Sequence, residues 1–331
     1  MQSVNQQCKL FVGCVSRNTI DSTIEYANEN NITLGLIPSR RQVDYDGGYV
    51  GFDSKRLHNY VRERSSNVII ERDHGGPLQG YEKDDGFSSF ADDCFYYDII
   101  HIDPWKAVKN FDSGCVLTAQ YMKYCLGKNP NMKFEVGTEQ SIFKYEADEL
   151  DYLLGYLEGF FSKNQFSQIL FAVIQSGTSL KENQNTGTYG IQRLSEMVDV
   201  CKKRGIWSKE HNGDYLPTLL VSEKFKAGLD SINIAPEFGQ IETQTYLNEI
   251  KELDLFDKYF TICYNSKRWE KWVDKSFDPF QNKEKLINIC GHYVLSQTDF
   301  LSEVKAKVRP DIDVVINEAL THRLDELCKV I

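Results

Sequence analysis

Short apolar segments alternate with longer helix-like segments through the first 250 residues, and this alternation most constrains the fold. Eight segments have the length and composition of strands: 9–16, 32–39, 67–77, 98–104, 133–139, 169–177, 215–223 and 231–239. Helical patterns separate most of them, at 19–31, 54–66, 113–127, 147–164, 189–205 and 242–253. The apolar runs lack a strict polar–apolar alternation, which is typical of parallel strands buried on both faces.

Eight consecutive strand–helix units predict an α/β fold of the (β/α)8 TIM barrel type. A doubly wound open sheet is the alternative, but it usually carries a GxGxxG loop after its first strand, and residues 13–19 read GCVSRNT. Residues 251–331 differ from the rest because they are rich in lysine and aromatic residues and are interrupted by Pro310. We therefore predict a barrel over residues 1–250 and a helical C-terminal extension over 251–331 that packs on it.

The net charge and the cysteine content indicate which partners and which cellular compartment to expect. The net charge of −10 argues against a general nucleic-acid binder, which usually shows a basic face. No apolar run approaches the roughly 18 residues that a membrane span needs, and the N-terminus lacks the features of a signal peptide. The nine cysteines are scattered without a CxxC motif, which is typical of reduced thiols. We expect a cytoplasmic protein with neither nucleic-acid nor membrane partners.

The ends of the predicted strands are the candidate site, because a TIM barrel places its active site at the C-terminal ends of its strands. The residues at these positions are polar, and many are ionisable: Ser16, Ser39, Arg40, Arg41, Asp73, His74, His101, Asp103, Glu139, Gln175, Glu223 and Glu237. Loops usually begin with polar residues, so a purely structural explanation stays open for each.

Residues 70–77, IERDHGGP, form the most informative segment. Adjacent strand residues face opposite sides, but the bend into the glycines could bring both Asp73 and His74 to the mouth of the barrel. Neutral imidazole is a frequent metal ligand, and a carboxylate beside it could relay a proton. The structural alternative is an aspartate that caps the turn and a histidine that packs beneath it.

Residues 39–49, SRRQVDYDGGY, suggest a phosphate site. Arginine offers bidentate donors, and glycine lets backbone N–H groups approach an anion. A solvated loop with a turn at its two glycines explains the segment equally well. Residues 175–179, QSGTS, are a weaker candidate for a phosphate or hydroxyl cradle. The predicted substrate contacts are Ser39, Arg40, Arg41, Gly47, Gly48, Gln175 and Ser176.

Carboxylates at several predicted strand ends suggest a mixed histidine and carboxylate metal site. Its expected ligands are His74, Asp103 and Glu223, with Glu139 and Glu237 nearby. An imidazole in such a set favours Zn or Mn over Mg. The alternative is a metal-free site in which arginines neutralise the carboxylates. The sequence does not place His292.

The chain resembles the class II tagatose-bisphosphate aldolase non-catalytic (accessory) subunit family, which is related to the class II ketose-bisphosphate aldolases. The resemblance rests on collinear segments spread over nearly the whole chain: SRRQV with GGY at 39–49, DHGGP at 73–77, HID at 101–103, VGTE at 136–139, APE at 235–237 and GHY at 291–293. It implies a (β/α)8 barrel that acts on a phosphorylated ketose in carbohydrate metabolism.

The resemblance also implies roles for particular residues. Asp73 and His74 resemble the pair that supplies the proton-transfer acid and a metal ligand in the related aldolases. Those enzymes add histidine ligands from strands seven and eight, where the predicted strand ends here carry Glu223 and Glu237. Either carboxylates replace those ligands, or the chain holds no catalytic metal.

Three functions follow as hypotheses. The first is metal-dependent aldol cleavage or condensation of a sugar (bis)phosphate, with Asp73 moving the proton and Glu139 or Glu237 as alternatives. Epimerisation or isomerisation of a sugar phosphate by the same enediolate chemistry is a close variant. The second is a non-catalytic subunit that stabilises a partner aldolase, and the third is a sugar-phosphate-binding protein. The chain is expected to form a homo-oligomer or to bind an aldolase subunit.

Overall fold

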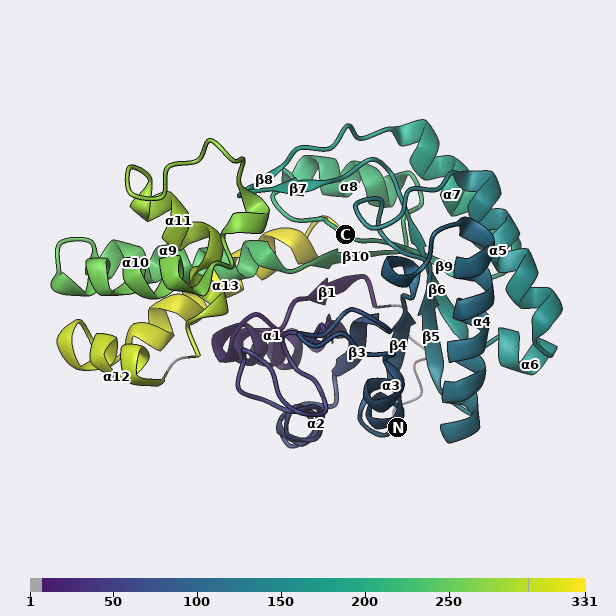
Figure 1. Ribbon diagram of the computed structural model, residues 1–331, viewed down its shortest axis with the longest axis horizontal. Helices are drawn as coiled ribbons and strands as arrows, with labels where there is room; N and C mark the ends of the chain where they lie inside the picture. Colours follow the sequence, from purple (N-terminus) through teal and green to yellow (C-terminus); the bar gives the residue numbers. More distant parts are fainter. Residues whose placement is uncertain (1–7, 297) are drawn as a thin grey trace.

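A closed barrel of eight parallel strands forms the centre of the computed structural model, which describes residues 8–296 and 298–331 (Figure 1). The barrel confirms the predicted fold class. In order around the barrel, its strands are β1 (Leu10–Val12), β2 (Leu34–Leu36), β3 (Val68–Gly75), β4 (Ile99–Ile102), β5 (Lys133–Val136), β6 (Ile169–Ile174), β9 (Trp207–Glu210) and β10 (Ser231–Ile234), which pairs back with β1.

Helices follow the strands and cover the outside of the barrel, as expected for alternating strand–helix units. They are α1 (Arg17–Glu29), α2 (Ser54–Arg62), α3 (Phe87–Tyr96), α4 (Phe111–Lys128), α5 (Ala147–Phe160), α6 (Lys163–Phe166), α7 (Ile191–Lys203), α8 (Thr218–Lys226) and α9 (Pro236–Ile250). A small hairpin of β7 (Leu180–Lys181) and β8 (Gln184–Asn185) lies in the loop after β6.

The seventh barrel strand is not where the sequence pattern predicts it. The predicted strand at 215–223 is wrong, because Thr218–Lys226 forms helix α8. A short apolar run without clear periodicity fits a strand or a buried helix equally well. The true seventh strand is β9, and it lacks an apolar run because it carries Lys209 and Glu210, both fully buried.

Buried charges fill part of the barrel interior next to this strand. Lys209 Nζ lies 2.6 Å from Glu71 Oε2 and 2.7 Å from Glu135 Oε2. The same ammonium group lies 3.6 Å from the centroid of the Phe11 ring. Removing one partner from such a buried group typically costs several kcal/mol, whereas the complete set is tolerated. The interior is therefore held together by paired charges as well as by apolar side chains.

Residues beyond α9 form further helices: α10 (Asp254–Ser266), α11 (Lys283–Cys290), α12 (Thr298–Lys307) and α13 (Ile312–Cys328), with short 3-10 turns η2 (Glu270–Trp272) and η3 (Gly291–Tyr293). These helices gather with α9 on one side of the barrel, and α13 packs against α1 and α9 (Figure 1). The division at residue 250 into barrel and extension stays a prediction. Within the described residues, no helix is both long and apolar enough to cross a bilayer.

Candidate functional site

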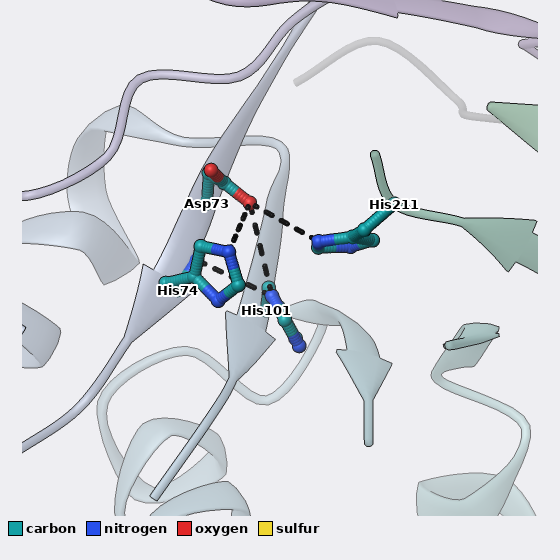
Figure 2. Close-up of side chains that lie close together, drawn as sticks. All are labelled: Asp73, His74, His101 and His211. Atoms are coloured by element: carbon teal, nitrogen blue, oxygen red, sulfur yellow. Dashed lines mark hydrogen bonds and ion pairs between the residues drawn. The ribbon is translucent and has the colours of Figure 1, made fainter. Parts of the chain in front are cut away.

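Four side chains converge at the C-terminal ends of the strands, and we call them the histidine centre: Asp73, His74, His101 and His211. One donor atom from each lies within 4.8 Å of the others, and Figure 2 shows their side chains pointing toward one another. Two of them end β3, one lies on β4, and the last follows β9. They leave different strands but meet at one mouth, as the barrel architecture predicts.

A distortion of β3 places two neighbouring side chains on the same side. The register of β3 against β4 shifts between Arg72 and Gly75, and His74 has a positive φ of 46°. A left-handed backbone costs a non-glycine residue about 1–2 kcal/mol. Because regular strand geometry would point Asp73 and His74 to opposite faces, this local strain is what brings both into the histidine centre.

Two of the three imidazoles are oriented by buried carboxylates behind them. His74 Nδ1 lies 2.6 Å from Asp103 Oδ2, and His211 Nε2 lies 2.6 Å from Glu135 Oε1. In a neutral imidazole, a ring N–H that donates to a carboxylate leaves the other ring nitrogen with a free lone pair. In both residues that second nitrogen faces Asp73. This carboxylate–histidine arrangement is the usual support for a metal-ligating imidazole.

The third imidazole is oriented by the backbone. His101 Nε2 lies 3.0 Å from the carbonyl oxygen of Gly137, to which its N–H donates. His101 Nδ1 is therefore an acceptor, and it receives the backbone N–H of His74 at 3.2 Å. The lone-pair side of this ring also faces the histidine centre. A metal bound there would compete with that backbone N–H for the same lone pair.

The carboxylate of Asp73 occupies the middle of the group. Its Oδ1 lies 3.7 Å from His74 Nε2, 3.9 Å from His211 Nδ1 and 4.0 Å from His101 Nδ1. This oxygen is buried and has no hydrogen-bond partner among the described residues. Metal–nitrogen bonds of about 2.0–2.1 Å in a tetrahedral site put neighbouring donor atoms about 3.4 Å apart. The donors are therefore close to the spacing that a divalent ion requires, and the unpaired oxygen fits such an ion.

The electrostatics of the centre favour a positive charge. Burial would lower the pKa of His74, but the carboxylates of Asp73 and Asp103 outweigh it and raise the pKa to about 10. Burial lowers the pKa of His101, which keeps this ring neutral. Burial would raise the pKa of Glu135, but Lys209 and the histidines hold it well below its usual range. The centre thus stabilises a positive charge, which protonated His74 carries when no metal is bound, and a metal ion would take the place of that proton.

A cavity of about 420 Å³ opens on the histidine centre. Its charged and polar lining includes Ser39, Arg41, Asp73, His74, Lys106, Glu139, His211, Asp214, Asn233 and Lys271. Its volume is in the range of small-molecule sites. His292, which the sequence does not place, also lines this cavity from η3.

The two predicted phosphate-binding arginines have different environments. Arg40 is buried and pairs with Asp44 at 2.7 Å and with Asp84 at 2.5 Å. It also donates to the carbonyl of Gly76 at 2.8 Å, so its guanidinium is occupied by the fold. Arg41 is exposed, lines the cavity and has no carboxylate within 4 Å among the described residues. Only Arg41 is free to meet a ligand in the cavity.

Of the other predicted substrate contacts, one lines the cavity and the rest lie outside its lining. Ser39 lines the cavity, whereas Gly47, Gly48, Gln175 and Ser176 do not. The Gln175 side-chain amide donates to the backbone carbonyls of two residues in the loop after β5. The Ser176 hydroxyl donates to a buried glutamate of β9. These hydrogen bonds hold the loops, and the contact of these residues with a substrate stays a prediction.

The carboxylates predicted for the site lie in different places in the structure. Glu139 lines the cavity and accepts a hydrogen bond from the Asn212 side chain. Glu237 lies in the first turn of α9, because β10 ends earlier than predicted, and it pairs with Arg323 at 2.7 Å outside the cavity lining. Glu223 lies exposed on α8 and so is not at a strand end. Asp103, a predicted ligand, instead supports His74 from behind.

His211 is the site residue that the sequence reasoning missed. It follows a strand whose residues are mostly polar, so hydropathy gives no sign that a strand ends there. His101 is among the predicted strand-end residues, but the sequence pattern assigns it no role. A usable signal for both was the presence of histidines beside strand ends, since the barrel brings such positions together.

No protein-family model and no curated protein matches this sequence. Solved structures share its fold. A probable tagatose 6 phosphate kinase from Sinorhizobium meliloti 1021 has a TM-score of 0.76 and 14% identity, covering 98% of this chain and 100% of that chain.

A fructuronate-tagaturonate epimerase from Cohnella laeviribosi has a TM-score of 0.67 and 12% identity, covering 99% of this chain and 82% of its own. A fructose-bisphosphate aldolase from Campylobacter jejuni has a TM-score of 0.56 and 11% identity, covering 98% and 91%. At these identities the likeness shows a common fold, shared by aldolases and an epimerase.

Proposed function

We propose that the protein is a metal-dependent enzyme that cleaves or forms a carbon–carbon bond in a phosphorylated ketose. The observation that carries this proposal is the orientation of three imidazoles. Each has one ring nitrogen committed to an outer acceptor and the other facing the unpaired Asp73 oxygen. Such an arrangement has little value in a structural core, where an unpaired buried oxygen is costly.

The histidine centre would hold the ion through His74, His101 and His211, with the Asp73 carboxylate beside it. Three protein ligands leave a coordination position open for a substrate oxygen. Three nitrogen donors favour Zn or Mn over Mg, which prefers oxygen ligands. A bound divalent ion supplies a Lewis acid that polarises a carbonyl oxygen. Asp103 and Glu135 keep two of the imidazoles in the tautomer whose lone pair faces the ion.

Proton transfer would fall to a carboxylate on the cavity wall. Asp73 is the first candidate, because it lies at the centre and the resemblance to the aldolases gives it this role. Glu139 is the second, because it lines the same cavity and is held there by Asn212. Glu237 is a poor candidate because it is paired with Arg323. Arg41 would bind the substrate phosphate through charge-assisted bonds.

Epimerisation of the same substrate class is the second candidate function. Epimerases and aldolases both stabilise negative charge beside a carbonyl, and both occur among the structures that share this fold. Two carboxylates on one cavity wall, Asp73 and Glu139, could remove and return a proton. The accessory-subunit hypothesis rests on the family resemblance and on the absence of histidines after strands seven and eight. His211 supplies one after the seventh barrel strand, whereas Ala235 and Pro236 follow the eighth.

The test is an assay of ketose monophosphates and bisphosphates for cleavage and for epimerisation, with added Zn²⁺ or Mn²⁺. We expect activity in the wild-type protein and its loss in His211→Ala. The matched control is His322→Ala, which removes an exposed histidine of α13 far in sequence from the strand ends. If the metal-loaded wild-type protein is inactive alone but active with a partner aldolase, the accessory role replaces the enzymatic one.

A further inference from the structure

A second cavity of about 490 Å³ adjoins the one that contains the histidine centre. Its lining comes from two distant parts of the chain: Arg41, Tyr81, Lys267, Arg268, Glu270, Lys271 and Tyr293. Arg41, Lys271 and Tyr293 line both cavities, so the two spaces share a wall. The C-terminal segment therefore contributes directly to the mouth of the barrel.

The cations Arg41, Arg268 and Lys271 line the second cavity without forming an ion pair with any described residue, and we call them the cationic rim. Among residues 8–296 and 298–331, no carboxylate lies within 4 Å of any of them. Their polar contacts are weak or to neutral groups. Arg41 Nε lies 3.4 Å from the carbonyl of Gly80, and Arg268 Nη1 lies 2.9 Å from the carbonyl of Tyr293. Donors therefore remain available on all three side chains.

Aromatic side chains hold the rim in place. The Arg268 guanidinium lies 5.2, 5.4 and 5.6 Å from the ring centroids of Tyr49, Tyr81 and Tyr293. Lys271 lies 5.2 Å from the Tyr293 ring. Cation–π contacts at such distances fix a cation without neutralising its charge. Helix α10 ends in a left-handed residue at Lys267, with φ of 55°, from which the chain enters the segment that carries the rim.

Crowding of like charges makes the rim receptive to an anion. Desolvation, together with the charges of Arg41 and Arg268, lowers the pKa of Lys271 to about 8. Three neighbouring cations that form no ion pair within 4 Å repel one another, although Glu270 lines the same cavity and Glu139 acts on Lys271, and a bound anion relieves that repulsion. A phosphate dianion compensates more charge than a carboxylate, and arginine binds it through a bidentate fork.

We propose that Arg268 and Lys271, in segment 267–272, join Arg41 to form the site for the terminal phosphate of the substrate, and that this segment selects phosphorylated over carboxylated sugars. The inference rests on the proposed function for the position of the reacting carbon at the histidine centre. The phosphate site adds substrate specificity to the proposed function and assigns it to the C-terminal region, outside the barrel strands.

The test measures binding directly and does not depend on turnover. Inorganic phosphate and galacturonate are titrated into wild-type protein, the Arg268→Ala/Lys271→Gln double variant, and Lys271→Gln alone. The single variant guards against misfolding, because its side chain is exposed. Lys275→Ala is the matched control, since Lys275 is an exposed lysine nearby that lines neither cavity.

We expect the double variant to bind phosphate at least about tenfold more weakly, because it loses two charge-assisted contacts. Lys271→Gln should bind it severalfold more weakly, and Lys275→Ala should bind it as the wild type does. Zn²⁺ binding should be the same in all four proteins, which separates this site from the histidine centre. Unchanged phosphate affinity in the double variant overturns the proposal, and galacturonate binding as tight as phosphate binding overturns its selectivity.

Discussion

The histidine centre and the cationic rim lie in the walls of adjoining cavities, but they differ in whether their side chains have partners of opposite charge. In the centre, His74 and His211 each have a carboxylate behind them, and one of those carboxylates is in turn paired with Lys209. In the rim, Arg41, Arg268 and Lys271 have no acidic partner among the described residues. The difference indicates that protein carboxylates preorganise the centre, whereas the rim is left for an anion from outside.

The same contrast appears between two adjacent residues. Arg40 is 3% exposed and forms ion pairs with Asp44 and Asp84. Arg41, its neighbour, faces the cavity. A motif of two arginines therefore contains one structural residue and one candidate ligand contact. Burial and pairing, rather than residue type, separate the two roles.

The largest expected effect is on stability, when the buried ion pairs of Arg40 are removed. Arg40→Ala should lower the free energy of unfolding by about 3–5 kcal/mol, because it leaves the buried Asp44 without its closest cation. Arg41→Ala should change it by no more than about 0.5 kcal/mol, as is usual for an exposed side chain. Urea denaturation of both variants measures the difference. Equal destabilisation would show that the two arginines are not divided as described.

The next largest expected effect is on Zn²⁺ affinity, when the carboxylate that orients His211 is changed. Glu135→Gln should weaken Zn²⁺ affinity about 10–100-fold, because it removes the charged partner of His211. Glu71→Gln is the matched control: Glu71 also contacts Lys209 but no histidine, and burial raises its pKa well above the usual range. Its Zn²⁺ affinity should stay near that of the wild type. Competition with a chelator gives both constants, and equal losses would contradict the role given to Glu135.

The smallest effect is a pH dependence at the rim. Lys271 has a lowered pKa of about 8, and it faces Arg41, Arg268, Glu139 and the Tyr293 ring. Its charge is complete below that pH and is lost as the pH rises through it. Phosphate affinity should therefore fall severalfold between pH 7 and 9 in the wild type. Lys271→Arg keeps its charge over this range, so its affinity should fall less, and identical profiles would contradict the prediction.

The sequence predicts those barrel strands that are apolar, and it fails for the one strand that is polar. Seven of the eight strand regions contain apolar runs, but the strand Trp207–Glu210 does not. It carries Lys209, whose partners Glu71 and Glu135 lie on other strands, and Glu210, whose partner Lys224 lies on α8. A local pattern cannot reveal a charge whose partner lies on another strand. The prediction therefore moved strand seven onto α8 and made Glu223 a ligand.

The site was predictable where one strand end supplied the residues, as for Asp73 and His74. It was not predictable where pairing decides the role. Arg40 and Glu237 have the residue types of a binding site, yet each is held by an ion pair with a distant residue. His211 could not be assigned without the correct seventh strand. The contribution of Arg268 and Lys271 depends on how the chain returns to the barrel after α10, which no motif signals.

The most direct test of the central claim is the metal content of the wild-type protein. Equilibrium dialysis against Zn²⁺ or Mn²⁺, followed by elemental analysis, should find about one ion per chain at micromolar or lower free metal, as expected for nitrogen-rich sites. His211→Ala should lose this ion and keep its fold by circular dichroism. If the wild-type protein binds neither ion at micromolar concentration, the histidine centre is not a metal site and the proposed enzyme mechanism is wrong.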